Sequence, residues 1–135
     1  MLYLGTETNK MKKVISTKNA PAAIGPYSQA IFSNNTLYCS GQIAINPTTG
    51  DLVMGNITAE TNQVMQNILG VLTAADMDFN NVVKCSIFMK DMNDYADINE
   101  VYTKSFGKNP PAREAVQVSV LPKNVNVEIS VIAVK

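Results

Sequence analysis

The chain has no histidine and no tryptophan, and it has one arginine among 135 residues. Without histidine it can form neither a histidine-based catalytic triad nor a histidine-ligated zinc site, and it has no imidazole base. Any catalysis must therefore use carboxylate, guanidinium, hydroxyl, lysine, amide or backbone groups. The two cysteines, Cys39 and Cys85, fit no metal-binding spacing and lie among apolar neighbours. We expect buried, reduced thiols, which indicate a reducing compartment such as the cytoplasm.

Charge is scarce as well. Charged residues make up 16% of the chain and the net charge is zero, so a nucleic-acid partner has no basic surface to bind beyond Lys12-Lys13. The sequence contains no apolar run of membrane-spanning length, so we expect a soluble protein with no membrane partner. Hydrophobic residues reach 46% of the chain. So many apolar side chains with so few charges suggest that part of the surface is buried in an oligomer.

The length suits one domain with one core. The first ten residues show no clear periodicity, and Met11-Lys12-Lys13-Val14-Ile15 is a natural start for the fold. We interpret residues 1–10 as a poorly ordered N-terminal extension and residues 11–135 as a single domain. The extension lacks the long apolar core of a signal peptide.

The pattern of apolar residues predicts three strands, a helix, a strand, a helix and two strands. Alternation indicates strands over residues 12–16, 28–33, 36–42, 82–90, 113–120 and 125–134. Helical spacing predicts helices over 58–75 and 95–106, capped by Thr58 and Asp94. Asn34-Asn35 suits a two-residue turn, because asparagine tolerates positive φ. This order predicts an α+β domain with two helices packed on one face of a sheet.

The single arginine, Arg113, opens the strand predicted over residues 113–120 and follows two prolines. Arginine is the side chain best suited to holding a planar carboxylate with two parallel hydrogen bonds. Alternation places Arg113 on the same face as Ala115 and away from the most apolar row, Val116, Val118 and Val120. On residue type and position alone, a surface arginine in a loose ion pair is the other interpretation.

A carboxylate lies inside the last predicted strand. Glu128 interrupts the apolar run from Val127 to Val131, and a carboxylate there needs a partner or a function. The other interpretation is a glutamate on a strand edge whose side chain reaches water.

Three further positions could add polar groups to a site. Ser40-Gly41-Gln42 ends a strand, and glycine there allows a ligand or another chain to approach the backbone, although an ordinary bulge or turn has the same pattern. Tyr27 could offer a phenol to a pocket, or it could be a core tyrosine with a satisfied hydroxyl. Asn99 lies on the second predicted helix, where a solvent-facing or capping amide is the usual role.

Six ordered blocks between residues 12 and 135 resemble one known family. The chain is similar to the RidA/YjgF family of reactive intermediate deaminases through these segments: residues 19–29 (Asn19-Ala20-Pro21-Ala22-Ala23-Ile24-Gly25-Pro26-Tyr27-Ser28-Gln29), Ser40-Gly41-Gln42, residues 46–50, residues 90–95, Pro111-Ala112-Arg113, and Leu121-Pro122-Lys123 through residues 127–129.

The resemblance implies a chorismate-mutase-like fold and a homotrimer, in which the sheets form a central barrel with clefts between subunits. It implies hydrolysis of 2-imino acids and their enamine tautomers, such as 2-aminoacrylate and 2-iminobutyrate, to 2-keto acids and ammonia, with no metal and no cofactor. By the same resemblance, Arg113 pairs with the carboxylate of the small substrate and Glu128 positions or activates water. Tyr27, Ser40, Gly41, Asn99 and Ala115 match substrate-binding positions, Gly41 and Ala115 through their backbone N–H groups.

The chain departs from the family at one of these positions. Ala115 stands where cysteine is common, so a thiol has no role there, and Glu114 adds a negative charge beside Arg113. Two other functions stay open at this stage: a non-catalytic trimer that binds small 2-keto acids, and a holdase-like interaction protein. Relatives have also been assigned ribonuclease activity, against which the zero net charge and the absent histidine argue.

Overall fold

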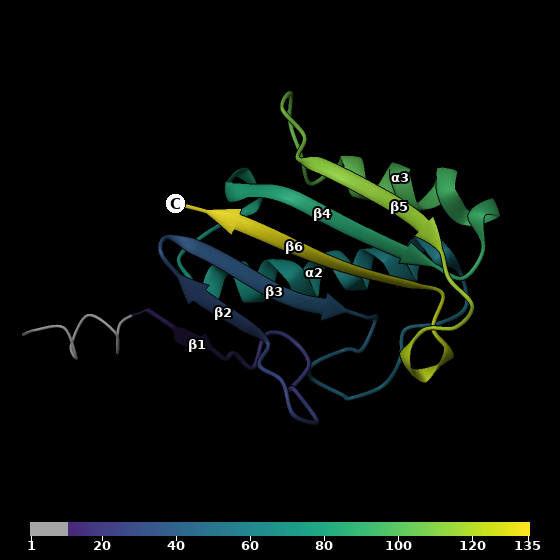
Figure 1. Ribbon diagram of the computed structural model, residues 1–135. Helices are drawn as coiled ribbons and strands as arrows, with labels where there is room; N and C mark the ends of the chain where they lie inside the picture. The colour runs from purple at the N-terminus through teal and green to yellow at the C-terminus, as the bar shows by residue number, and fades with distance from the viewer. Residues whose placement is uncertain (1–10) are drawn as a thin grey trace, which may run out of the picture.

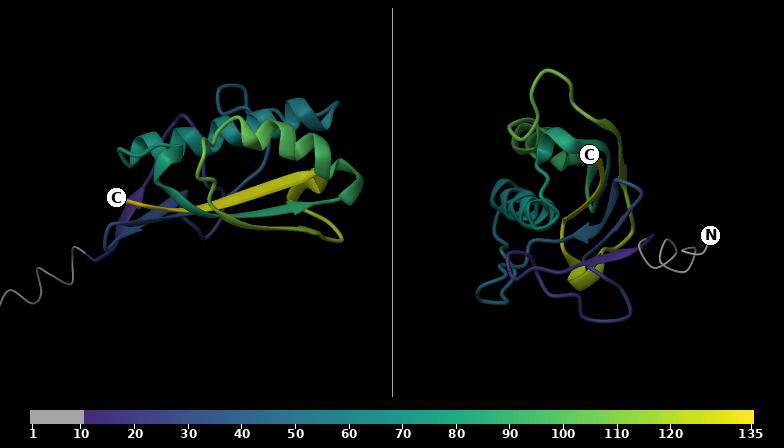
Figure 2. Two further views of the ribbon diagram at one scale, coloured as in Figure 1. Left: turned by 90° about the horizontal axis from the view of Figure 1, so that it is seen from above. Right: turned by 90° about the vertical axis from the view of Figure 1, so that its left-hand side faces the viewer.

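The computed structural model describes residues 11–135, which form a six-stranded sheet with two helices on one of its faces (Figures 1 and 2). Residues 1–10, interpreted above as an extension, lie outside the described residues. The strands are β1 (Lys13–Ile15), β2 (Ala30–Ser33), β3 (Thr36–Gln42), β4 (Val82–Met89), β5 (Ala112–Gln117) and β6 (Val127–Val134). The helices are α2 (Ile57–Ala74) and α3 (Tyr95–Thr103), with short 3-10 turns η1 (Phe79–Asn81), η2 (Met92–Asp94) and η3 (Pro122–Asn124).

The strand order in the sheet is β1-β2-β3-β6-β4-β5. The first three strands form an antiparallel meander, and β4 and β5 are parallel because α3 carries the chain back between them. The last strand, β6, lies in the middle and is antiparallel to both β3 and β4. Both helices cover the same face (Figure 2), so the predicted α+β class with two helices on one face is confirmed. Neither helix in residues 11–135 is long and apolar enough to cross a membrane.

The predicted turn at Asn34-Asn35 is confirmed, since both residues have positive φ, 51° and 61°. Of the two predicted helix caps, Thr58 is wrong, and Asp94 stands at the N-cap position of α3 without a capping hydrogen bond. Asn56, not Thr58, caps α2, because its side-chain oxygen accepts a hydrogen bond from the N–H of Ala59 at 2.7 Å. Asp94 makes no capping bond, because it closes the 3-10 turn η2.

Several predicted boundaries also shift, and the second strand begins at Ala30 rather than at residue 28. Helix α3 ends at Thr103 rather than 106, because the next three N–H groups bond to carbonyls only three residues back. The fifth strand ends at Gln117, three residues before the predicted end, and β6 begins at Val127, two residues after the predicted start. These shifts leave the order of the elements as predicted.

Alternate residues of the central strands face the helices and form the core, among them Leu37, Cys85, Ile87, Ile129 and Val131. The opposite face, the open face, is covered by neither helix of residues 11–135 (Figure 2). In-register apolar residues cross the open face from β1 to β6, where Val14 pairs with Ile31, Ile31 with Tyr38, and Tyr38 with Ile132.

The apolar row of the fifth strand belongs to this open face. Val116 is 41% exposed, and Val120, just beyond the strand, is 65% exposed. Alternation therefore separated the two faces of the strand correctly, but the more apolar one is not the face that packs under the helices. An apolar face that the described residues leave uncovered is a surface that another molecule can cover.

A β-bulge interrupts β3 near its end. Cys39 pairs with Val131 and Gln42 pairs with Ile129, so β3 uses one more residue than β6 between the two pairs. The extra residue breaks the alternation, and neither Ser40 nor Gly41 is buried between the buried Cys39 and Gln42. Bulges redirect side chains at the point where a strand leaves its partner.

Candidate functional site

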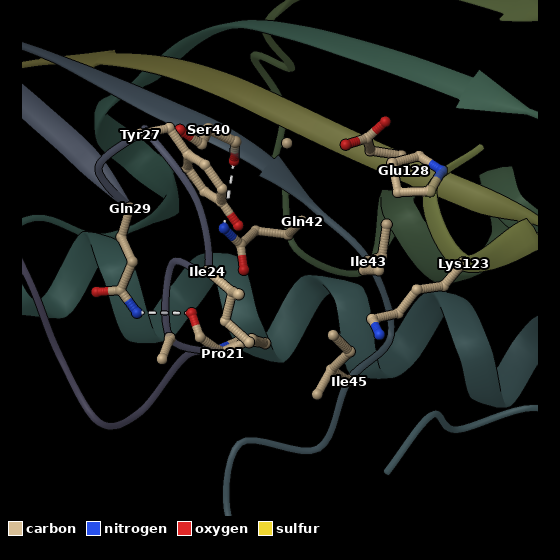
Figure 3. A pocket seen from close by; sticks show the side chains of 13 residues that line it. Pro21, Ile24, Tyr27, Gln29, Ser40, Gln42, Ile43, Ile45, Lys123 and Glu128 are labelled. Carbon is tan, nitrogen blue, oxygen red and sulfur yellow. Dashed lines mark hydrogen bonds between the residues drawn. The ribbon is translucent and has the colours of Figure 1, made fainter. Parts of the chain in front are cut away.

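A pocket of about 650 Å³ opens where the bulged end of β3, the start of β6 and the loop of residues 21–27 meet (Figure 3). Its apolar lining comes from Pro21, Ala22, Ile24, Ile43, Ile45 and Pro122, and its polar lining from Tyr27, Gln29, Ser40, Gly41, Gln42, Lys123 and Glu128. Four residues predicted for the site, Tyr27, Ser40, Gly41 and Glu128, are thus brought together. Apolar walls around a few convergent polar groups are typical of small-molecule sites.

The carboxylate of the pocket is Glu128, and its side chain packs against Gly41. A Cβ atom at position 41 would lie 2.8 Å from Cδ of Glu128 and 3.0 Å from its Cγ, so the glycine makes room for the glutamate. Glu128 is half-buried, and burial raises the pKa of its carboxyl above the usual value. Because β6 is a central strand, the interpretation of Glu128 as a strand-edge residue is wrong.

The other polar residues fix the wall of the pocket. The buried side chain of Gln29 accepts a hydrogen bond from the N–H of Thr17 at 2.6 Å and donates to the carbonyl of Pro21 at 2.8 Å, which holds the loop over the sheet. The hydroxyl of Ser40 donates to the carbonyl of Ser28 at 2.6 Å. This bond uses the hydroxyl proton, so the oxygen of Ser40 can only accept a hydrogen bond from a ligand.

Arg113 lies elsewhere, on the face of the sheet that the helices cover. Its Nη1 donates to Oδ1 of Asn99 at 2.7 Å and its Nη2 donates to the hydroxyl of Tyr95 at 3.0 Å. Its Cζ lies 4.9 Å from the ring centroid of Tyr102 and 5.6 Å from that of Tyr95. A planar cation held by two hydrogen bonds and two aromatic rings has little freedom left to lose on binding an anion. The interpretation of Arg113 as a surface arginine in a loose ion pair is therefore wrong.

The side chains around the arginine on this face are buried or partly buried. Ala115 packs against the core on the face that Arg113 occupies. Tyr102 is 5% exposed, and its hydroxyl has no hydrogen-bond partner among residues 11–135. Burial raises the pKa of the Cys85 thiol, so this cysteine stays protonated and unreactive at neutral pH. Cys39 is also buried and unpaired, as the sequence predicts, and burial raises its pKa to about 12.

One chain does not bring Arg113 and Glu128 together. Arg113 lies opposite Cys85 on β4, whereas Glu128 lies opposite Phe88, three positions further along the same strand. The arginine points to the helix side and the glutamate belongs to the open face, with β4 between their strands. The predicted residues therefore form two groups, a glutamate pocket (Tyr27, Ser40, Gly41, Glu128) and an arginine cluster (Arg113, Asn99, Ala115). The structure adds Tyr95 and Tyr102 to the arginine cluster.

The side chain of Glu114, next to Arg113 in the sequence, points away from the guanidinium. Its carboxylate accepts a hydrogen bond from the hydroxyl of Ser86 and pairs with Nζ of Lys84 at 3.0 Å, both on the open face. Both contacts lower the pKa of Glu114, and the hydrogen bond from Ser86 has the larger effect. Glu114 therefore does not occupy the guanidinium of Arg113.

The sequence did not single out several pocket residues. Gln29 and Lys123 lie within the blocks that carry the resemblance, but their residue types gave no chemical reason to choose them. Ile43 and Ile45 gave no signal, because an apolar residue that lines a pocket looks like one that fills a core. Asn67 holds both of their carbonyls, at 3.0 and 2.9 Å, through its buried side-chain amide.

Among residues 11–135, no three histidine, cysteine, aspartate or glutamate side chains gather where they could hold a metal ion. The polar groups of both regions are suited to holding a small anion and to moving a proton. A guanidinium binds a carboxylate, and a half-buried carboxylate with a raised pKa can act as a base near neutral pH.

Comparison with known proteins gives consistent matches along nearly the whole chain. A family model described as endoribonuclease L-PSP matches residues 17–135. A RutC family protein of Pyrococcus horikoshii is 54% identical over 93% of this chain and 99% of its own length. The 2-iminobutanoate/2-iminopropanoate deaminase of Mus musculus is 49% identical over 93% of each chain. A crystal structure from Yersinia pestis, of a protein of unknown function in the Rid family, is 52% identical with a TM-score of 0.90, and the match covers 92% of this chain and 99% of that one.

Proposed function

Because the chain belongs to the RidA/YjgF family, we propose that it is a deaminase of reactive 2-imino acids. The proposed substrates are 2-aminoacrylate, 2-iminobutyrate and their tautomers, and the products are 2-keto acids and ammonia. The deaminase name of the mouse relative supports the reaction class. The observation that carries the proposal is the half-buried Glu128 in a pocket with Ser40 and Tyr27, because binding an anion alone gains nothing from a nearby carboxylate.

We infer that two copies of the chain build each site. In one chain Arg113 and Glu128 lie on opposite sides of the sheet, too far apart in register to hold one small substrate. The strand β5 is an edge strand, and the open face leaves apolar side chains exposed. A homotrimer that covers the open face and sets the arginine cluster of one copy against the glutamate pocket of the next accounts for both features.

In this arrangement the arginine cluster supplies binding. The substrate has the form R–C(=NH2⁺)–COO⁻, and its carboxylate accepts two hydrogen bonds from the guanidinium of Arg113. Asn99, Tyr95 and Tyr102 hold that guanidinium in place, so Asn99 serves the substrate through the arginine. The backbone of Ala115, on the edge strand two residues later, offers a further anchor. The free thiols that both cysteines keep suit a protein of a reducing compartment such as the cytoplasm.

The glutamate pocket supplies the chemistry. The carboxylate of Glu128 takes a proton from a water molecule as the water oxygen bonds to the imine carbon, which gives a carbinolamine. Glu128 then returns the proton to the nitrogen, and the C–N bond breaks so that ammonia leaves. As the C=O bond forms, the carbinolamine hydroxyl gives its proton to Glu128, which is ionised again at that point, and the proton passes on to the departing ammonia. Ser40 accepts a hydrogen bond from the imine nitrogen or the water, because its own proton is engaged by Ser28. The imine carbon is already electrophilic, so orientation and one proton carrier suffice.

Other functions fit the site less well. Ribonuclease chemistry needs cationic groups around a phosphate, and Lys123 is the one cation among the residues that line the pocket. A non-catalytic trimer that binds 2-keto acids would need Arg113 but not Glu128. A holdase would depend on the exposed apolar side chains of the open face and would be indifferent to both residues.

The test is the release of ammonia and 2-keto acid from 2-aminoacrylate and 2-iminobutyrate, each generated in situ by a dehydratase. We expect the wild type to accelerate hydrolysis and Glu128→Gln to lose roughly a hundredfold in kcat, the usual contribution of a general base. Glu114→Gln is the matched control, since it removes a carboxylate from the open face without touching the pocket. Equal hydrolysis with and without the wild-type protein would refute the proposal and leave the pocket as a binding site.

A further inference from the structure

A second glutamate, Glu60, is completely buried in the first turn of α2, with 0% of its surface exposed. It has no ion pair among the described residues. Its carboxylate instead accepts three hydrogen bonds from the segment that precedes β6. The N–H of Asn126 donates to Oε2 at 2.8 Å, the side-chain amide of Asn126 donates to Oε1 at 2.8 Å, and the N–H of Val127 donates to Oε2 at 3.2 Å.

These bonds replace strand pairing on the β3 side of β6, since on the other side β6 pairs with β4 as far as Val127, opposite Met89. The pairing of β6 with β3 begins only at Ile129, opposite Gln42, because the bulge turns β3 away. The N–H groups of Asn126 and Val127 would be buried without acceptors at this point, which costs free energy. Glu60 supplies both acceptors, and it reaches them from an element 66 residues away in the chain.

The segment that Glu60 holds carries two parts of the pocket. Two residues after Asn126 comes Glu128, and before it comes the turn η3, whose Pro122 and Lys123 line the pocket. The turn is tied on its other side by Lys90, whose N–H donates to the carbonyl of Asn126 at 3.0 Å and whose Nζ donates to Oδ1 of Asn124 at 3.0 Å. Glu60 therefore anchors the one point at which the pocket wall becomes the strand of the glutamate.

We propose that Glu60 is a positioning residue for the reaction, which fixes the start of β6 so that Glu128 lies over Gly41 and faces the substrate. The inference rests on the proposed role of Glu128. Glu60 itself is enclosed by the protein, so it acts on the reaction through Glu128 and does not touch the substrate.

The variants are Glu60→Met, Glu60→Gln and Thr61→Val. Methionine fills similar volume but offers the two N–H groups no oxygen, so we expect kcat to fall at least tenfold with KM within about threefold of wild type. Glutamine keeps one acceptor oxygen, and the amide of Asn126 can turn to meet its NH2 group, so we expect most of kcat to return. Thr61 is the matched control, because it is equally buried and its hydroxyl bonds within α2 to the carbonyl of Ile57 at 2.7 Å.

A double-mutant comparison separates positioning from general loss of folded protein. If Glu60 acts through Glu128, Glu60→Met lowers kcat at least tenfold in the wild type and hardly at all in Glu128→Gln. If Glu60→Met only destabilises the fold, it lowers the activity per total protein by the same factor in the wild type and in Glu128→Gln, and kcat per folded protein stays unchanged in both. That second result would overturn the inference.

A readout without turnover keeps the inference apart from the proposed function. Nuclear magnetic resonance titration of the Glu128 side chain measures its pKa, which burial raises in the wild type. We expect the pKa of Glu128 to fall toward the usual glutamate value in Glu60→Met and to stay raised in Thr61→Val. Tyr27 and Lys123 are the other titratable residues that line the pocket. An unaltered Glu128 pKa in Glu60→Met would overturn the inference. A wild type without deaminase activity would overturn the proposed function alone.

Discussion

The arginine cluster and the glutamate pocket lie on the same sheet but differ in how firmly their charged side chain is held. The guanidinium of Arg113 is held by two hydrogen bonds and two aromatic rings, all from α3, so its geometry is set before a ligand arrives. Glu128 has a raised pKa, lies over a glycine and has no ion pair within residues 11–135. A prearranged cation is suited to binding, and an unpaired carboxylate is suited to taking up a proton.

The difference explains why the two groups need not lie together in one chain. A site that both binds and transfers a proton needs them within a few ångströms, and assembly can supply that proximity. A change in the arginine cluster should therefore affect substrate binding first, and a change in the glutamate pocket should affect the proton transfer first.

The largest effect is expected for Arg113→Ala. Loss of two charge-assisted hydrogen bonds to the substrate carboxylate costs about 4 kcal/mol, or roughly a thousandfold in kcat/KM. Arg113→Lys keeps the charge but not the planar fork, so it should recover only part of the loss. Steady-state kinetics with circular dichroism and sedimentation of each variant checks both statements. An Arg113→Ala protein that is correctly assembled and nearly fully active would contradict the binding role.

Gly41→Ala should be next in size. The added Cβ would collide with Cδ and Cγ of Glu128, so the glutamate must move. A displacement of about 1 Å can lower kcat roughly a hundredfold. Gly107→Ala is the control, since its Cβ meets no atom within 4 Å. Steady-state kinetics of Gly41→Ala and Gly107→Ala is the measurement, and equal kcat values for the two variants would show that the position of Glu128 does not matter.

The pH dependence of kcat/KM tests whether Glu128 is the residue that takes up the proton. Glu128 must be ionised to act as a base, so kcat/KM should fall about tenfold per pH unit below its pKa, which burial places above the usual glutamate value. Hydrolysis rates corrected for the uncatalysed reaction give the profile. The profile should be the same in Glu114→Gln, and a limb at the usual glutamate pKa in the wild type would contradict the assignment.

The same shift has the opposite consequence for stability. Because the pKa is higher in the folded than in the unfolded state, the ionised Glu128 costs stability. The cost is absent below the usual glutamate pKa, develops between the two pKa values and is complete above the folded one. Glu128→Gln should therefore raise the Tm at neutral pH and leave it unchanged in acid, while it lowers activity.

The smallest effect is expected for Tyr95→Phe. The substitution removes the hydrogen bond to Nη2 of Arg113 and keeps the ring, so a loss of about 1 kcal/mol, or roughly fivefold, should appear in KM. Tyr95→Leu removes the ring as well and should raise KM further. If Tyr95→Phe lowered kcat and spared KM, the arginine cluster would not be the binding half.

Alternation and helical spacing were sufficient to predict the order of the elements and the two faces of the fifth strand. They separated Arg113 from the valines of its strand, but they could not say which face the helices cover. Apolar content normally marks the core, but the row with Val116 is exposed because no helix of residues 11–135 covers it. The alternation of side chains along a strand does not show which of its two faces the rest of the protein covers.

The candidate site was predictable where a residue type was out of place and unpredictable where it was ordinary. Arg113 and Glu128 stood out as a lone cation and as a carboxylate in an apolar strand. The bulge that places Ser40 and Gly41 in the pocket depends on the register between β3 and β6, which single-strand patterns do not contain. Glu60 gave no signal, because a glutamate in the first turn of a helix is common.

Mixing two inactive variants tests the central claim, that Arg113 and Glu128 act from different copies. Arg113→Ala and Glu128→Gln chains are unfolded together, refolded at equal amounts and assayed beside each variant alone. If the site joins two copies of a homotrimer, activity should return to about a quarter of wild type, because three in four trimers are mixed and each has one intact site. Activity no higher than that of the separate variants, with mixed assembly verified by mass spectrometry, would contradict the account.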